Sequence, residues 1–129
     1  MSDLTDVERI AASLPGTTEG NNGGQFAFSV LNKGKHKGFA WTWMERVQPK
    51  KPRVPNPGVL AVRVPSLSDK EALLATDSSK FFTEDHYNGF PAVLVRLGAI
   101  DIDELEELLV DAWRSQAGSA LVAEFDARG

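Results

Sequence analysis

The chain has 129 residues, 42% of them hydrophobic and 25% charged, no cysteine and a formal net charge of −4. This length and composition fit a single folded domain, residues 1–129, and exclude a disordered, collagen-like or coiled-coil protein. The absence of cysteine excludes disulfides, thiol catalysis and thiolate metal sites.

The amino-terminal residues predict a helix over residues 3–14. Apolar residues recur there at helical spacing behind a capping-box pattern from Thr5 to Glu8, and Pro15 and Gly16 end the helix. The same residues lack the basic start and apolar run of a signal peptide. No apolar run is long enough to span a membrane. We therefore expect a cytoplasmic protein with no membrane partner.

Three strands are predicted next, because aromatic and β-branched residues alternate with small or polar ones. They cover residues 25–31, 38–44 and 59–64. A polar turn that contains Gly34 joins the first two as a hairpin. Between the second and third strands, residues 45–58 hold four prolines, which predict an extended loop without ladder or helix.

The second half of the chain predicts two helices and two strands. A short helix covers residues 66–76, capped by Ser66 or Ser68, with its leucines Leu67, Leu73 and Leu74 turned inward. Short strands are expected at residues 81–82 and 92–97. A long amphipathic helix follows from Asp101 to about Gly118, and the apolar residues after it indicate one or two further helical turns.

This order of elements predicts an α+β fold with two layers. One helix, three strands, a helix, two strands and a helix, joined by short links, favour a mostly antiparallel sheet with the helices on one face. The other face of the sheet is then open to solvent or to a partner.

Several segments resemble the MmcQ/YjbR-like family of small bacterial proteins. The similar residues are the Leu-Pro-Gly-Thr helix exit at 14–17, the Phe-x-Val strand that leads to a Gly-Lys hairpin, the Asp-His-Tyr-Asn-Gly-Phe-Pro run at 85–91, and the Val-Leu-Val-Arg-Leu strand with Asp-Ala-Trp-Arg at 111–114. The resemblance implies a two-layer α+β fold similar to secretion-chaperone-like domains, and a nominal role in DNA binding.

Basic residues are concentrated in the segment from Lys33 to Arg53. This segment carries seven basic side chains and one acid, whereas the rest of the chain carries seven bases and seventeen acids. Clustered cations on an acidic protein are typical of phosphate binding. The candidate nucleic-acid contacts are Lys33, Lys35, Lys37, Lys50, Lys51 and Arg53. The alternative is that these side chains only form a solvated, solubilising surface.

Aromatic residues in the second strand offer a second candidate surface. Phe39, Trp41 and Trp43 alternate, so they are expected on one face, with Lys37 continuing it. Exposed aromatics on a sheet can stack the bases of a single strand; the alternative is that they face the helices and fill the core. By the same alternation, Arg63 and Arg96 are expected on the open face.

Metal and catalytic sites are not indicated. Glu84, Asp85 and His86 are neighbours in an extended run, so they point in alternating directions, and His86 is interpreted as a turn residue that bonds backbone near Gly89. The sequence has no nucleophile elbow and no phosphate loop. We therefore expect a protein that is not an enzyme and needs no cofactor or metal.

Two hypotheses for function follow. The first is weak, salt-sensitive binding of nucleic acid through the six cationic side chains. The second is a protein-interaction or small-ligand module that uses an apolar surface around Trp41, Trp43, Tyr87 and Phe90, whose binding would be insensitive to salt.

Overall fold

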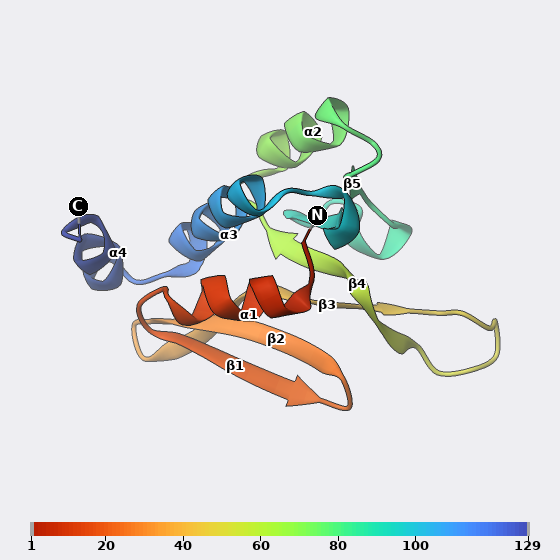
Figure 1. Ribbon diagram of the computed structural model, residues 1–129, viewed down its shortest axis with the longest axis horizontal. Helices are drawn as coiled ribbons and strands as arrows, with labels where there is room; N and C mark the ends of the chain where they lie inside the picture. The colour runs from red at the N-terminus through yellow and green to blue at the C-terminus, as the bar shows by residue number, and fades with distance from the viewer. Residues whose placement is uncertain (1, 129) are drawn as a thin grey trace.

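The computed structural model describes residues 2–128, which form one six-stranded antiparallel sheet with helices packed on one face (Figure 1). The strands lie in the order β1-β2-β3-β4-β6-β5. The elements are α1 (Leu4–Ala12), β1 (Thr17–Asn22), β2 (Gln25–Asn32), β3 (Lys35–Glu45), β4 (Val54–Arg63), α2 (Leu67–Thr76), β5 (Phe81–Phe82), the 3-10 turn η1 (Asp85–Tyr87), β6 (Ala92–Arg96), the 3-10 turn η2 (Leu97–Ala99), α3 (Ile102–Gln116) and α4 (Ser119–Asp126).

The main core lies between the sheet and the helices α1 and α3. It is built from the apolar stripes of both helices and the helix-facing residues of β2, β3, β4 and β6. Trp113 of α3 is fully buried there, and its indole Nε1 donates to the Pro15 carbonyl at 3.0 Å. The predicted α+β class, with helices on one face of the sheet, is confirmed. The other face is not fully open, because it carries a second, smaller buried cluster made of Val59, Ala61, Tyr87, Ala92 and Leu94.

The strand β1 was not predicted from the sequence. Its residues, Thr-Thr-Glu-Gly-Asn-Asn, have no apolar alternation, and most of them are exposed at the edge of the sheet. It forms because its backbone pairs along its whole length with β2, from Thr17 opposite Val30 to Asn22 opposite Gln25. The sheet therefore has six strands where five were expected.

The prediction of a loop without ladder over residues 45–58 was wrong in its second half. β4 begins at Val54, and its first residues pair with β3, with Asn56 opposite Trp43 and Val54 opposite Glu45. β6 pairs with β4 only from Val59 to Arg63, so Pro55 and Pro57 lie where β4 is an edge. Prolines are tolerated on edge strands because no partner on that side needs their amides.

A β-bulge in β3 changes which face its aromatic residues occupy. Ser29 pairs with Gly38 and Phe28 pairs with Ala40, which leaves Phe39 as an extra residue. Phe39 and Ala40 are both buried in the helix-covered core. Trp41 is consequently moved to the opposite face, so the expectation that Phe39, Trp41 and Trp43 share one face was wrong.

The helix α2 follows its predicted orientation only in part: Leu73 and Leu74 pack against the main core as expected. Ser66 is its N-cap, as one of the two predicted alternatives, but Leu67 is 46% exposed and does not turn inward. The buried residue of this helix is Lys70, which is 5% exposed.

Candidate functional site

The six predicted cationic contacts fall into two groups at opposite ends of β3. Lys33, Lys35 and Lys37 lie at the β2–β3 turn, whereas Lys50, Lys51 and Arg53 lie in or beside the β3–β4 loop. A strand advances about 3.3 Å per residue, so Lys35 and Glu45, the two ends of β3, are roughly 33 Å apart. Figure 1 shows the β3–β4 loop projecting from the sheet, at the end away from α4. The structure does not bring the two groups together.

The two groups also differ in the face of the sheet that they approach. Lys37 pairs with Val30 and Lys35 with Asn32, so both share the face of the helix-covered core. Asn32 lies beside the carboxyl end of α3, where its Nδ2 donates to the Gln116 carbonyl. The expectation that Lys37 continues the surface of Trp41 was therefore wrong.

The loop group is anchored by its own backbone and remains available to a ligand. Arg53 donates from Nη1 to the Met44 carbonyl at 3.0 Å, and Arg46 donates to the carbonyls of Pro49 and Lys51. Within residues 2–128, none of the six predicted cations is within 4.0 Å of a carboxylate oxygen. Lys50, Lys51 and Arg53 thus carry positive charge that no neighbouring acid neutralises.

Arg53 also lines a hollow of about 260 Å³ on the face of the sheet opposite α1 and α3, which we call the aromatic pocket. Its lining residues are Gln25, Trp41, Trp43, Met44, Arg53, His86 and Tyr87. They come from β2, β3, the β3–β4 loop and the turn η1, so distant parts of the sequence form one site.

The walls of the aromatic pocket are fixed by aromatic contacts and one hydrogen bond. The Trp41 Nε1 donates to the Tyr87 hydroxyl at 3.0 Å, and the Trp43 ring packs edge-on against Phe82 at 5.9 Å between centroids. His86 packs edge-on against Tyr87 at 5.4 Å. Both tryptophans are half-buried, so part of each indole remains accessible to a ligand.

Lys70 holds the turn that carries Tyr87. Its Nζ donates to the Tyr87 carbonyl at 2.5 Å and to the Phe90 carbonyl at 2.9 Å. Burial lowers the pKa of this amine below its ordinary value, because the charged form is desolvated. Lys70, which the sequence pattern did not single out, thus bonds the backbone on both sides of Gly89.

Two arginines extend the face that carries the aromatic pocket, as the alternation in β4 and β6 predicted. The Arg63 guanidinium lies 4.8 Å from the centroid of Phe90, and that of Arg96 lies 4.1 Å from the centroid of Phe82. Such cation–π contacts keep the guanidinium groups over the aromatic rings.

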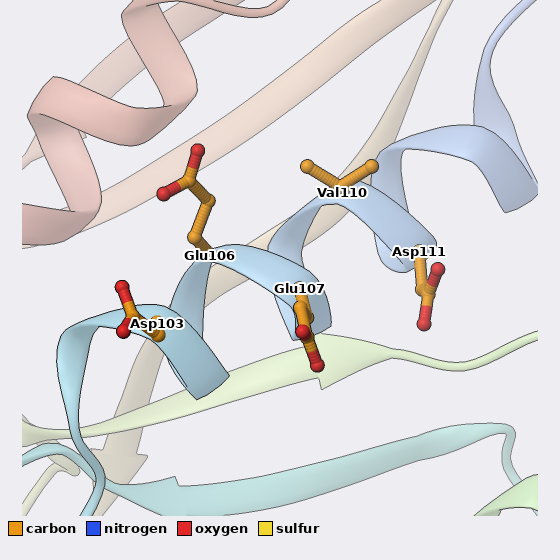
Figure 2. Close-up of a pocket in the computed structure, with 5 residues that line it drawn as sticks. All are labelled: Asp103, Glu106, Glu107, Val110 and Asp111. Carbon is orange, nitrogen blue, oxygen red and sulfur yellow. The ribbon is translucent and has the colours of Figure 1, made fainter.

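A larger hollow, of about 620 Å³, lies against α3 and has the opposite charge. Figure 2 shows its lining, in which Asp103, Glu106, Glu107 and Asp111 spread along the helix and their carboxylates point in different directions. Divergent carboxylates on an exposed helix face repel phosphate and do not converge on a cation. We therefore take the aromatic pocket, and not this hollow, as the candidate site.

Metal ligands do not gather in the part of the chain that the structure describes. Across residues 2–128, no three His, Asp or Glu side chains are close enough together to hold a metal ion. Among the helices of the same residues, none has the length and apolar character needed to cross a membrane.

Sequence reasoning found part of this pocket. Arg53 was predicted as a phosphate contact, and Trp41, Trp43 and Tyr87 were named in the alternative apolar surface. Gln25 and Met44 were missed. The available signal was Gly38 directly before Phe39, because a glycine inside a strand often marks a bulge; a bulge there moves both tryptophans away from the helices.

Comparison with known families gives one match over most of the chain. A family model described as YjbR matches residues 12–115, a range that includes β1 to β6, α2 and nearly all of α3.

Two mycobacterial proteins are among its relatives by sequence. They are the uncharacterized protein Rv2570 of Mycobacterium tuberculosis (strain ATCC 25618 / H37Rv) and the uncharacterized protein Mb2600 of Mycobacterium bovis. Each is 44% identical over 71 residues, which is 55% of this chain and 55% of the relative. The match thus spans about half the length of these relatives.

A solved structure has the same fold. The crystal structure of the Deinococcus radiodurans protein DR2400, with the domain DUF419, aligns with a TM-score of 0.65 at 22% sequence identity. The alignment covers 88% of this chain and 77% of that one. At this level of identity the likeness concerns the fold.

Proposed function

The chain belongs to the YjbR family, and from this premise we propose that it is a non-enzymatic protein that binds nucleic acid weakly at the end of the sheet that carries the β3–β4 loop. Lys50, Lys51 and Arg53 would contact phosphates, without a cofactor. The binding would be directed mainly at the backbone of the nucleic acid.

One observation carries this proposal. Three cations of the β3–β4 loop are exposed and free of carboxylates within residues 2–128, and one of them, Arg53, lines the aromatic pocket. Phosphates and bases are recognised by this combination of cations and aromatic rings. The acidic surface of α3 lies on the other face of the sheet and would disfavour binding there.

The dependence of affinity on salt tests the proposal. Each neutralised phosphate contributes about −0.7 to −0.9 to the slope of log K against log salt, so three contacts predict a slope of about −2 to −3. Six convergent contacts would give about −4 to −5. The measurement is fluorescence anisotropy of a labelled ten-nucleotide DNA between 20 and 200 mM salt.

Charge reversal at the two ends of β3 provides a matched control. The double variant Lys50→Glu, Lys51→Glu should lose most binding, whereas Lys35→Glu, Lys37→Glu should change the affinity for this short DNA much less. Absence of binding at the lowest salt, or an equal loss in both variants, would contradict the assignment to the loop end.

The second candidate function is binding of a small, uncharged aromatic ligand or a protein side chain in the same pocket. It is favoured by the packing of Trp41 and Tyr87, which line the pocket, on the same ring of Phe90, at 6.4 and 6.2 Å between centroids. This function predicts binding that is independent of salt and unaffected by reversal of Lys50 and Lys51.

A further inference from the structure

The aromatic pocket has features that backbone-directed binding does not need. A surface that captures only phosphates requires exposed cations, but here Arg53 stands at a hollow with three aromatic side chains and an imidazole. The volume of about 260 Å³ is just below the roughly 300–1,000 Å³ of pockets for drug-sized ligands. The hollow therefore suits one ring-sized group.

The polar atoms in the pocket are positioned to meet the edge of such a ring. The Gln25 Nε2 donates a hydrogen bond to the Thr42 carbonyl at 3.3 Å, so the Gln25 Oε1 remains as an acceptor. The Tyr87 hydroxyl accepts from Trp41, which leaves its own proton for donation. A group that presents both donors and acceptors at its edge matches this lining, and a nucleobase is such a group.

The positive charge of Arg53 at the entrance of the aromatic pocket indicates which chemical group is attached to the ring that binds there. Arg53 donates from Nη1 to the Met44 carbonyl, and a guanidinium has five N–H donors in all. The remaining donors can bind a phosphate oxygen next to the ring. Lys50 and Lys51 precede Arg53 in the chain and can contact the phosphates that follow.

The pocket is also held in shape before a ligand arrives. Lys70 ties the backbone of Tyr87 and Phe90 to α2, and the Trp41 to Tyr87 hydrogen bond joins the turn η1 to β3. A wall fixed in this way loses little side-chain freedom on binding, which favours a specific site.

From these contacts we infer that the aromatic pocket takes one unstacked nucleobase of a single strand, against Trp43, while Arg53 binds the neighbouring phosphate. Paired bases in a duplex are stacked on each other and cannot enter a pocket, so the protein would prefer single strands. This inference rests on the proposed function and adds base recognition to it.

The test compares two single strands of equal charge with a duplex, which carries about twice as many phosphates. Tryptophan fluorescence is titrated at 50 mM salt with a thymidine decamer, with an abasic decamer of the same length, and with a ten-base-pair duplex. Stacking contributes about 1–3 kcal/mol per base, so the thymidine decamer should bind about 5- to 150-fold more tightly than the abasic one. It should also quench the emission of Trp41 and Trp43, whereas Trp113 is buried in the other core.

Two variants and a control assign the effect to this site. Trp43→Leu should remove most of the preference for bases and retain the salt slope, and the leucine keeps apolar contact with Phe82. Arg53→Gln should make the slope of log K against log salt less negative by about 0.7, which is the contribution of one phosphate contact on a single strand. Phe125→Leu, on α4 and far along the chain from the pocket, should bind as the native chain does.

The outcomes distinguish base recognition in the aromatic pocket from the binding of nucleic acid on which it rests. Equal affinity for the thymidine and abasic decamers, with a normal salt slope, overturns base recognition and leaves the proposed function intact. Quenching of the tryptophan emission by the duplex as strong as that by the thymidine decamer overturns it as well. No binding of any probe at low salt overturns both. The comparison of probes uses the native chain, so it does not depend on the folding of a variant.

Discussion

Single residues set the geometry of the turns on which the fold depends. Gly16 has a φ of +68° between α1 and β1, and Gly34 has a φ of +79° in the β2–β3 turn. Residues with a Cβ atom adopt this left-handed region at a cost, so both turns favour glycine. The two positions differ in their surroundings, which makes them a matched pair.

Alanine at Gly16 should destabilise the protein more than alanine at Gly34. A Cβ at Gly16 would lie 2.5 Å from the Leu121 Cδ1 of α4, whereas a Cβ at Gly34 meets nothing within 4 Å. We expect Gly34→Ala to lower the free energy of unfolding by about 1–2 kcal/mol, and Gly16→Ala by about 1 kcal/mol more. Urea denaturation of both variants measures the difference; equal losses would mean that Leu121 adapts without cost.

At the scale of elements, α2 supports the aromatic pocket through one buried amine. Lys70 is the buried residue of this short helix, and its two hydrogen bonds bind the turn that carries Tyr87 to α2. A buried cation with only carbonyl partners is costly to keep charged. The stability of the protein should therefore respond to the protonation of Lys70.

The pH dependence of Lys70 has a defined sign. Its pKa is lower in the folded than in the unfolded chain, so between these two values unfolding takes up a proton and stability rises with pH. The free energy of unfolding of the native chain, relative to Lys70→Met, should increase as the pH rises from below the folded pKa toward about 10.4.

Lys80 provides a control of opposite sign. Its hydrogen bond to Glu104 raises its pKa in the folded chain, so its stabilising contribution is present below the unfolded pKa and is lost as the pH rises through the folded value. Relative to Lys80→Met, the native chain should thus lose stability at alkaline pH. A parallel response of both variants in urea denaturation would refute the account of Lys70.

The elements also show why the sequence predicted some features and missed others. The helix α3 was predicted because its apolar stripe follows one period without interruption, and the structure confirms it. The strand β1 carries no such pattern, since its pairing is made by backbone groups alone. The bulge at Phe39 breaks the simple alternation, because one extra residue moves the later residues of β3 to the opposite face of the sheet.

The candidate site could be predicted only in part, because the sequence shows residue types but not which of them the fold brings together. Residue types indicated phosphate and aromatic contacts, and Arg53, Trp41 and Trp43 do line one pocket. Spacing along the chain could not show that Lys33 and Lys50 lie at opposite ends of a long strand. Nor could it show that Lys70, near the middle of a helix, reaches the turn that carries Tyr87.

For the whole molecule, the opposed charges of its two faces affect association at a distance. The acids of α3 lie on the helix-covered side, whereas Arg53 and Arg96 lie on the side of the aromatic pocket. Long-range fields act over about 30 Å at 10 mM salt and over about 8 Å at 150 mM. The acids of α3 should therefore weaken the capture of a polyanion only at low salt.

Removing two of these charges tests the long-range effect. Glu106→Gln with Glu107→Gln should tighten binding of the thymidine decamer about two- to fourfold at 10 mM salt and leave it unchanged at 150 mM. The ratio of thymidine to abasic affinity should stay constant at both salts, because no contact in the pocket changes. An effect that persists at 150 mM would contradict a purely long-range origin.

The extended pairing of β3 with β4 limits how far the β3–β4 loop can extend from the sheet. Because the ladder continues to Glu45 and Val54, only residues 46–53 form the connecting loop, and Arg46 cross-links its backbone. A short, braced connection has few conformations to lose on contact, so ordering it costs little conformational entropy. The same bracing restricts the positions that Lys50 and Lys51 can reach, so they can contact only a few nucleotides beside the bound base.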